Sequence, residues 1–272
     1  MSKIILITGA TSGIGKETAK ALARTDSTVV IVGRHEQKTQ NATHEIKEFS
    51  GNSNIDYFIT DLSLMSEVIK LAHQFKERYS RLDTLINNAG VFLPEKIMTQ
   101  ENMETTFATN YLSPFLLTNL LIEHLQLSPQ GRIINVSSGA YEEANLDFEN
   151  IQAEKSYDGG MVYANSKLEI ILFTLKMANI LQNTSVTVNS FNPGRVATDL
   201  NRLVQTQPNP NDKTPEEGAQ TAIYLAISPD VRNINGNYFY LNKPILLSEK
   251  ALNLEWQDKL WQISNSLINR FI

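Results

Sequence analysis

The middle of the chain contains three kinds of side chain that can donate or accept protons. A serine pair, Ser137-Ser138, ends an apolar run, and Tyr163 and Lys167 follow four residues apart. Residues at this spacing lie on one face of a helix. An ammonium near a phenol favours the phenolate and lowers the tyrosine pKa from about 10. The pattern predicts a proton-transfer site, in which a serine hydroxyl could hold a carbonyl or alcohol oxygen.

The first residues of the chain predict a nucleotide site beside this chemistry. An apolar run over 4–7 leads into Thr8-Gly9-Ala10-Thr11-Ser12-Gly13-Ile14-Gly15, and residues 16–23 have a helical pattern. A strand, a glycine turn and a helix N-terminus form an anion site, because backbone N–H groups and the helix dipole face the phosphates. The spacing Gly-x-x-x-Gly-x-Gly differs from the commoner Gly-x-Gly-x-x-Gly fingerprint. A tight turn without a ligand is the alternative.

The choice between the two nicotinamide dinucleotides depends on the end of the second apolar run. Residues 28–32 are followed by Gly33-Arg34, about 20 residues after the glycines. In dinucleotide-binding folds, the residue that contacts the adenosine ribose lies at about this distance. An acid would accept a hydrogen bond from the 2′-hydroxyl of NAD, whereas an arginine suits the 2′-phosphate of NADP. The sequence has no acid at either position. It therefore favours NADP(H), with NAD(H) as the alternative.

Strand-like apolar runs alternate with helical patterns along the chain. Strands are expected at 4–8, 28–32, 55–60, 82–86, 131–137, 185–191 and 236–240, and helices near 14–25, 36–49, 64–79, 100–126, 161–182 and 216–227. Such alternation implies right-handed crossovers and a parallel sheet that is covered on both faces. We predict an α/β fold: a single Rossmann-type, doubly wound domain over residues 1–272, with seven parallel strands in three αβα layers. Substrate loops are expected near 139–162 and 195–213, and a C-terminal helical extension at 248–272.

Composition excludes several classes of protein. The net charge is −5 without a basic run, which argues against a nucleic-acid surface. The absence of cysteine excludes disulfides, thiolate metal sites and cysteine catalysis, and the four scattered histidines predict no metal site. The apolar run at 4–7 is too short for a membrane span and passes directly into the glycine turn. We expect no integral membrane segment and a cytoplasmic protein.

Taken together, these residues resemble the short-chain dehydrogenase/reductase family. The matching positions, in the family's order, are Thr8-Gly9-x-x-x-Gly13-Ile14-Gly15, Asp61-Leu62, Asn87-Asn88-Ala89-Gly90, Asn110, Ser138, Tyr163-x-x-x-Lys167 and Pro193-Gly194. The segments 148–157 and 166–173, with the long interval between Ser138 and Tyr163, resemble the retinol-dehydrogenase-like branch. The branch resemblance does not identify a substrate.

The resemblance implies hydride transfer between NADP(H) and a carbonyl or alcohol substrate. Tyr163 would be the general acid/base. Lys167 would lower its pKa and bind the nicotinamide ribose, Ser138 would orient the substrate oxygen, and Asn110 would hold a water in a proton relay. The implied cofactor-binding residues are Gly9, Thr11, Ser12, Gly13, Ile14, Gly15, Arg34, Asp61, Leu62, Asn88, Ala89, Gly90, Tyr163, Lys167, Pro193, Gly194, Val196 and Thr198. The position of Ser12 is often basic in NADP-using relatives, so the preference for NADP(H) rests on Arg34.

Two other functions are compatible with such a fold. A non-catalytic cofactor-sensing or scaffold protein usually lacks part of the Ser/Tyr/Lys set, which is complete here. A sugar-nucleotide epimerase or dehydratase is disfavoured by the glycine spacing and by the lack of an extra substrate domain.

The partners of the chain are less closely defined. We expect a small-molecule substrate that is partly apolar, and a homodimer or homotetramer. The residues that suggest an apolar pocket are Phe92, Leu93, Tyr141, Met161, Leu200 and Leu203. An apolar stripe of Trp256, Leu260, Ile263, Leu267 and Phe271 packs either on the body, on a subunit or on a membrane surface.

Overall fold

Near-continuous apolar segments form the central sheet of the computed structural model, which describes residues 2–200 and 209–272. In these residues the strands are β1 (Lys3–Thr8), β2 (Ser27–Gly33), β3 (Ile55–Ile59), β4 (Thr84–Asn87), β5 (Arg132–Val136), β6 (Thr187–Asn192), β7 (Tyr238–Tyr240) and β8 (Lys243–Ile245). Their order in the sheet is β3-β2-β1-β4-β5-β6-β7-β8, and β1 to β7 are parallel. The order reverses beside β1, which is where doubly wound sheets bind ligands.

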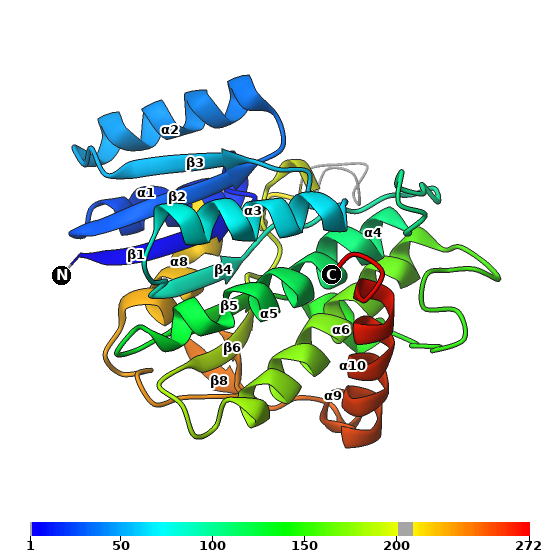
Figure 1. The fold of residues 1–272 in the computed structure, drawn as a ribbon. Coiled ribbons are helices and arrows are strands. Elements are labelled where there is room, and N and C mark those ends of the chain that lie inside the picture. The colour runs from blue at the N-terminus through cyan, green and yellow to red at the C-terminus, as the bar shows by residue number, and fades with distance from the viewer. Residues whose placement is uncertain (1, 201–208) are drawn as a thin grey trace.

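Helices cover both faces of this sheet, as the alternating pattern predicts (Figure 1). One face carries α1 (Gly13–Ala23), α2 (Glu36–Ser50) and α8 (Pro215–Ile227), and the other carries α3 (Met65–Arg78), α5 (Ser113–Gln126) and α6 (Gly159–Ile180). Each layer has its own core: Leu22 and Ile46 pack in the first, and Phe75 and Phe115 in the second. The predicted three-layer αβα domain is confirmed.

The predicted number of seven strands is one too few. The additional strand, β8, pairs antiparallel with β7 at the edge of the sheet. Leu241 and Asn242 form the tight turn between them, with φ of 49° and 63°. Hairpin turns with positive φ usually contain Asn-Gly or Asp-Gly, and a leucine there gives no such signal. Pro244 lacks an N–H group, so it suits an edge strand.

The helical stretch expected at 100–126 is interrupted in the structure. It comprises α4 (Thr105–Phe107), the π-helical turn η1 (Ala108–Leu112) and α5. Pro114, in the first turn of α5, has no N–H group, so it cannot donate the ordinary helical hydrogen bond to the carbonyl of Asn110. The proline thus accounts for an irregular turn at Asn110.

The C-terminal segment packs on the helix that carries Tyr163 and Lys167. It contains α9 (Glu249–Leu252) and α10 (Leu254–Ile268), and α10 packs against one end of α6 (Figure 1). The ring of Trp261 lies 5.0 Å from that of Phe115 and 6.3 Å from that of Phe173, between ring centroids. Of the predicted apolar stripe, Leu260 is buried in the core and Trp256, Leu267 and Phe271 pack against it, so the stripe packs on the body. No helix in residues 2–200 and 209–272 is both long and apolar enough to cross a membrane.

Candidate active site

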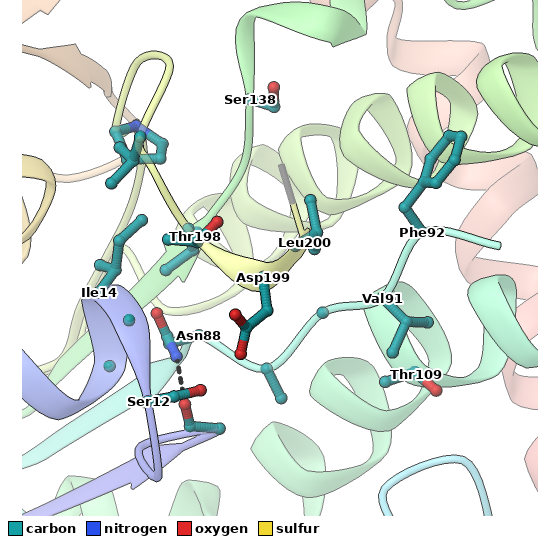
Figure 2. Close-up of a pocket in the computed structure, with 18 of the residues that line it drawn as sticks. Ser12, Ile14, Asn88, Val91, Phe92, Thr109, Ser138, Thr198, Asp199 and Leu200 are labelled. Carbon is teal, nitrogen blue, oxygen red and sulfur yellow. Dashed lines mark hydrogen bonds between the residues drawn. The ribbon is translucent and has the colours of Figure 1, made fainter. Parts of the chain in front are cut away.

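A cavity of about 910 Å³ opens at the carboxyl ends of the parallel strands. Every predicted cofactor-binding residue lines this cavity, and so does Ser138. Figure 2 shows residues from both ends: Ser12, Ile14 and Asn88 lie around the glycine turn, and Val91, Phe92 and Thr109 lie across the cavity from them. Among the predicted site residues only Asn110 does not line it. The sequence therefore placed nearly the whole set at one edge of the sheet.

The glycine turn is shaped to receive an anion. Gly9 and Gly13 have φ of 64° and 54°, in the left-handed region that favours glycine. A Cβ atom on Gly15 would lie 2.4 Å from the Asn88 side-chain nitrogen and 2.5 Å from the Gly9 carbonyl oxygen, so only glycine fits there. The helix α1 has no acidic residue in its first turn, and the Ser12 side chain does not cap it. The first N–H groups of α1 are thus left for phosphate oxygens, which fits a dinucleotide.

Thr8, which the sequence analysis matched as the first residue of the glycine motif without giving it a role, is a structural residue of the turn. Its hydroxyl oxygen accepts hydrogen bonds from the N–H groups of Asn88 at 3.0 Å and Ala89 at 3.1 Å. The Asn88 side-chain amide in turn donates to the carbonyls of Thr8 and Gly9, at 2.9 and 3.1 Å. These bonds hold the loop after β4 against the glycine turn. The signal in the sequence was the hydroxyl residue at the end of β1.

Three cationic or titratable side chains stand at the far end of the cavity. Arg34 follows β2, His35 precedes α2, and Lys38 lies in the first turn of α2; all three line the cavity and are exposed. In the described part of the chain, Arg34 forms no ion pair or hydrogen bond. Its guanidinium is therefore available to a charged group of a ligand. Lys38 was not identified from the sequence.

The catalytic candidates come from the end of β5 and from α6. Ser138 follows β5 in extended backbone, and its hydroxyl oxygen accepts a bond from the Ala140 N–H at 3.2 Å. Tyr163 and Lys167 lie one turn apart on α6, which Asp158 caps by accepting a bond from the Met161 N–H at 2.8 Å. The predicted i, i+4 arrangement is confirmed.

Burial controls the protonation of Tyr163 and Lys167. It raises the pKa of the Tyr163 phenol to about 12, although a hydrogen bond with the Ser138 hydroxyl acts in the opposite direction. Burial lowers the pKa of the Lys167 ammonium to about 8. In this structure the predicted lowering of the tyrosine pKa is therefore wrong. The Lys167 Nζ lies 5.3 Å from the centre of the Tyr163 ring and donates to the Val136 carbonyl at 3.2 Å, so the cost of burying a phenolate prevails.

Asn110 lies behind the cavity and its side chain is already engaged. The side-chain oxygen accepts a bond from the Val91 N–H at 2.7 Å. The side-chain nitrogen donates to the Val91 carbonyl at 2.9 Å and to the Ser166 hydroxyl at 3.0 Å. Both N–H groups of the Asn110 amide are therefore used, so any water that Asn110 binds has to donate to one of its oxygens. The sequence could not show which side-chain groups of the residue are engaged.

The expected substrate loops contribute to the cavity unequally. Phe92 and Leu200 line it, as the sequence suggested. Tyr141 instead lies in the core, where its hydroxyl oxygen accepts a bond from the Ser248 N–H at 3.3 Å. Met161 lines a separate cavity of about 270 Å³. Leu203 lies outside the described residues.

Comparison with known proteins gives the family. The sequence model of the family described as "short chain dehydrogenase" matches residues 3–209. The chain therefore belongs to the short-chain dehydrogenase family and is an oxidoreductase of that family, as the sequence resemblance predicted.

The relatives and solved structures give its position within the family. Retinol dehydrogenase 14 of Mus musculus is 38% identical over 286 residues, which cover 98% of this chain and 86% of that protein. Polyprenol dehydrogenase of Homo sapiens is 34% identical over 276 residues, which cover 96% of this chain and 84% of that protein. A short chain dehydrogenase structure from Escherichia coli CFT073, complexed with NADPH, has a TM-score of 0.72 at 27% identity and covers 87% of this chain and 95% of that chain. The retinol-dehydrogenase-like branch is confirmed.

Proposed function

We propose that this chain transfers a hydride between NADP(H) and a carbonyl or alcohol group, with Tyr163 as the general acid/base. The observation that carries the proposal is the convergence of Ser138, Tyr163 and Lys167 in the same cavity as the glycine turn. Family membership supports it. A cofactor sensor or scaffold would need the cavity but not the Ser/Tyr/Lys set.

The protonation states suit the reductive direction. The hydride would be supplied by the reduced nicotinamide. The Ser138 and Tyr163 hydroxyls hold the carbonyl oxygen, and the neutral Tyr163 phenol donates its proton as negative charge develops there. The Lys167 ammonium stabilises the phenolate that remains. The proton returns to Tyr163 through water that donates to an oxygen of Asn110, whose amide N–H groups already bond Val91 and Ser166.

We assign the cofactor preference to the exposed cations at the end of β2. Arg34 and Lys38 line the cavity where the ribose of a dinucleotide would be read, and a 2′-phosphate would give their charges a partner. The NADPH complex of the Escherichia coli neighbour supports this assignment. NAD(H) remains the alternative cofactor.

The substrate class follows from the apolar part of the cavity and from the relatives. Phe92 and Leu200 give the cavity an apolar wall. The names of the two relatives refer to retinol and polyprenol, which are apolar alcohols. We propose an apolar alcohol or aldehyde as the substrate. The cytoplasmic location and the homodimer or homotetramer stay predictions; in this structure α10 already covers one flank of α6.

Cofactor titration followed by turnover tests the proposal. The purified chain is titrated with NADPH and NADH by fluorescence, and NADPH oxidation is then followed with aldehydes, ketones and quinones, retinal among them. We expect tighter binding of NADPH and turnover with apolar aldehydes. Binding without turnover on the whole panel would favour the sensor, and tighter binding of NADH would contradict the role of Arg34.

The pH dependence of reduction should report Lys167. Since kcat/KM reflects the free enzyme, we expect it to be constant below pH 7 and to fall by about tenfold per unit above a pKa of about 8, as the Lys167 ammonium is lost. A profile that stays flat to pH 10 would contradict this.

The free energy of unfolding should rise over the pH range in which kcat/KM falls. A loss of activity caused by ionisation can therefore be distinguished from one caused by unfolding. The folded pKa of Lys167, about 8, lies below the ordinary value of 10.5. Between these values the unfolded chain binds more protons than the folded one, so the Lys167 contribution to the free energy of unfolding rises with pH. Thermal denaturation across this window checks that the loss of activity is not unfolding.

A further inference from the structure

We propose that Ser166 is a positioning residue, which fixes the Tyr163 phenol by linking its helical turn to Asn110. This inference rests on the proposed function. Ser166 does not line the cavity and is 1% exposed, so it does not touch a substrate or cofactor. Its effect has to pass through the residues that it holds.

The hydroxyl of Ser166 joins two elements that are far apart in the sequence. It donates to the Tyr163 carbonyl at 2.7 Å, within α6. Its oxygen accepts a bond from the Asn110 side-chain nitrogen at 3.0 Å, from η1. Both capacities of the hydroxyl are therefore used, as a buried hydroxyl requires. The bond fixes the catalytic turn of α6 relative to the π-helical turn.

These bonds are part of a closed ring of contacts around the phenol. Asn110 also binds both backbone groups of Val91, at 2.7 and 2.9 Å. Phe92, the next residue, places its ring edge-on to the Tyr163 ring, with the centroids 5.8 Å apart. Asn110 thus fixes the Tyr163 backbone through Ser166 and the Tyr163 side chain through Val91 and Phe92. The hydrogen bonds of Ser166 complete this circuit of contacts. The neighbouring Ser137 adds a similar tie, because its hydroxyl donates to the Lys167 carbonyl at 2.8 Å.

Loss of this hydroxyl should affect catalysis more than folding. Without it, one Asn110 N–H is left without a partner, and the amide is free to turn away from Val91. The phenol then loses a defined position relative to Ser138. Displacement by a fraction of an ångström lowers the rate of a positioned proton transfer, whereas the glycine turn and Arg34 are untouched.

The same helix offers a matched control. Thr174 on α6 is fully buried, donates to the Ile170 carbonyl at 2.7 Å, and accepts a bond from the Asn135 side-chain nitrogen at 2.9 Å. It has the same bonding pattern as Ser166 but lies two turns further from Tyr163. Thr174→Val removes an equivalent hydroxyl and keeps the volume of the side chain. This variant measures what the loss of a buried, hydrogen-bonded hydroxyl on α6 does to stability and kcat when the hydroxyl is not tied to Tyr163.

The experiment compares Ser166→Ala, Ser166→Thr and Thr174→Val in NADPH-dependent carbonyl reduction. For Ser166→Ala we expect kcat to fall by about tenfold, with the KM for NADPH within about twofold of the parent value. Ser166→Thr keeps the hydroxyl and should retain most of kcat. Thr174→Val should lower the melting temperature about as much as Ser166→Ala and leave kcat nearly unchanged.

Two results overturn the inference in distinguishable ways. If the parent chain reduces a carbonyl and Ser166→Ala loses no more kcat than Thr174→Val, Ser166 is only structural and the proposed function stands. If the parent chain reduces nothing on the panel, the proposed function falls and the inference falls with it. Should Ser166→Ala not fold, Ser166→Cys replaces it, since its thiol has a similar volume but is a weak hydrogen-bond donor. The expectations for Ser166→Ala then apply to Ser166→Cys.

Discussion

Tyr163→Phe is expected to lower kcat for carbonyl reduction by about 10³-fold, with NADPH affinity within about twofold of the parent value. The substitution removes only the hydroxyl that we propose as the proton donor. The ring keeps its edge-on contact with Phe92, so we expect the fold and the cavity to be retained. Steady-state kinetics and fluorescence titration with NADPH measure the two quantities separately.

A second tyrosine of the same region is the control for this prediction. Tyr157 lies just before α6, and its hydroxyl donates to the Leu93 carbonyl at 2.8 Å without lining the main cavity. Tyr157→Phe removes a hydrogen-bonded hydroxyl near the site and should keep most of the turnover. If Tyr163→Phe also keeps most of its turnover, the assignment of the general acid is wrong.

Arg34→Glu should reverse the cofactor preference. NADPH affinity is expected to fall by about 10²-fold, because the substitution replaces the proposed charge-assisted contact with the 2′-phosphate by repulsion. NADH affinity should be kept or increase, since a carboxylate accepts a hydrogen bond from a 2′-hydroxyl. The ratio of the two dissociation constants, from parallel fluorescence titrations, is the measured quantity.

Two further variants show whether this effect is local. Arg24→Glu makes the same change of charge at an exposed residue outside the cavity, and should leave the ratio unchanged. Lys38→Ala should weaken NADPH binding less than Arg34→Glu, because it removes one positive charge without adding a negative one. If Arg24→Glu and Arg34→Glu shift the ratio equally, long-range charge and not contact determines the preference.

The parts of the site that were predictable from the sequence follow from local rules. The glycine turn had to be a strand–turn–helix unit, and Tyr163 and Lys167 had to share a helix face. Parallel strands then brought the glycine turn, Ser138 and Gly194 to one edge of the sheet, where the cavity is found. None of these steps required knowledge of side-chain contacts.

The remaining features depend on tertiary contacts, which a single sequence does not display. The pKa of Tyr163 is raised because the folded chain buries the phenol and directs the Lys167 ammonium partly toward Val136. The Asn110 side chain is engaged because Val91 and Ser166 are brought to it from other elements. The strand β8 forms because Leu241 adopts a backbone conformation that leucine rarely takes.

The packing of α10 on α6 joins the predicted active site to the last helix of the fold. The predicted catalytic residues all precede residue 168, yet one flank of α6 is covered by residues 254–268. A buried bond between the hydroxyls of Tyr111 and Ser264, at 2.6 Å, ties α10 to the π-helical turn that contains Asn110. Chains emerge from the ribosome N-terminal end first. A nascent chain therefore presents every predicted catalytic residue before the helix that packs on α6 has been made, and we expect turnover to begin only after synthesis has passed α10.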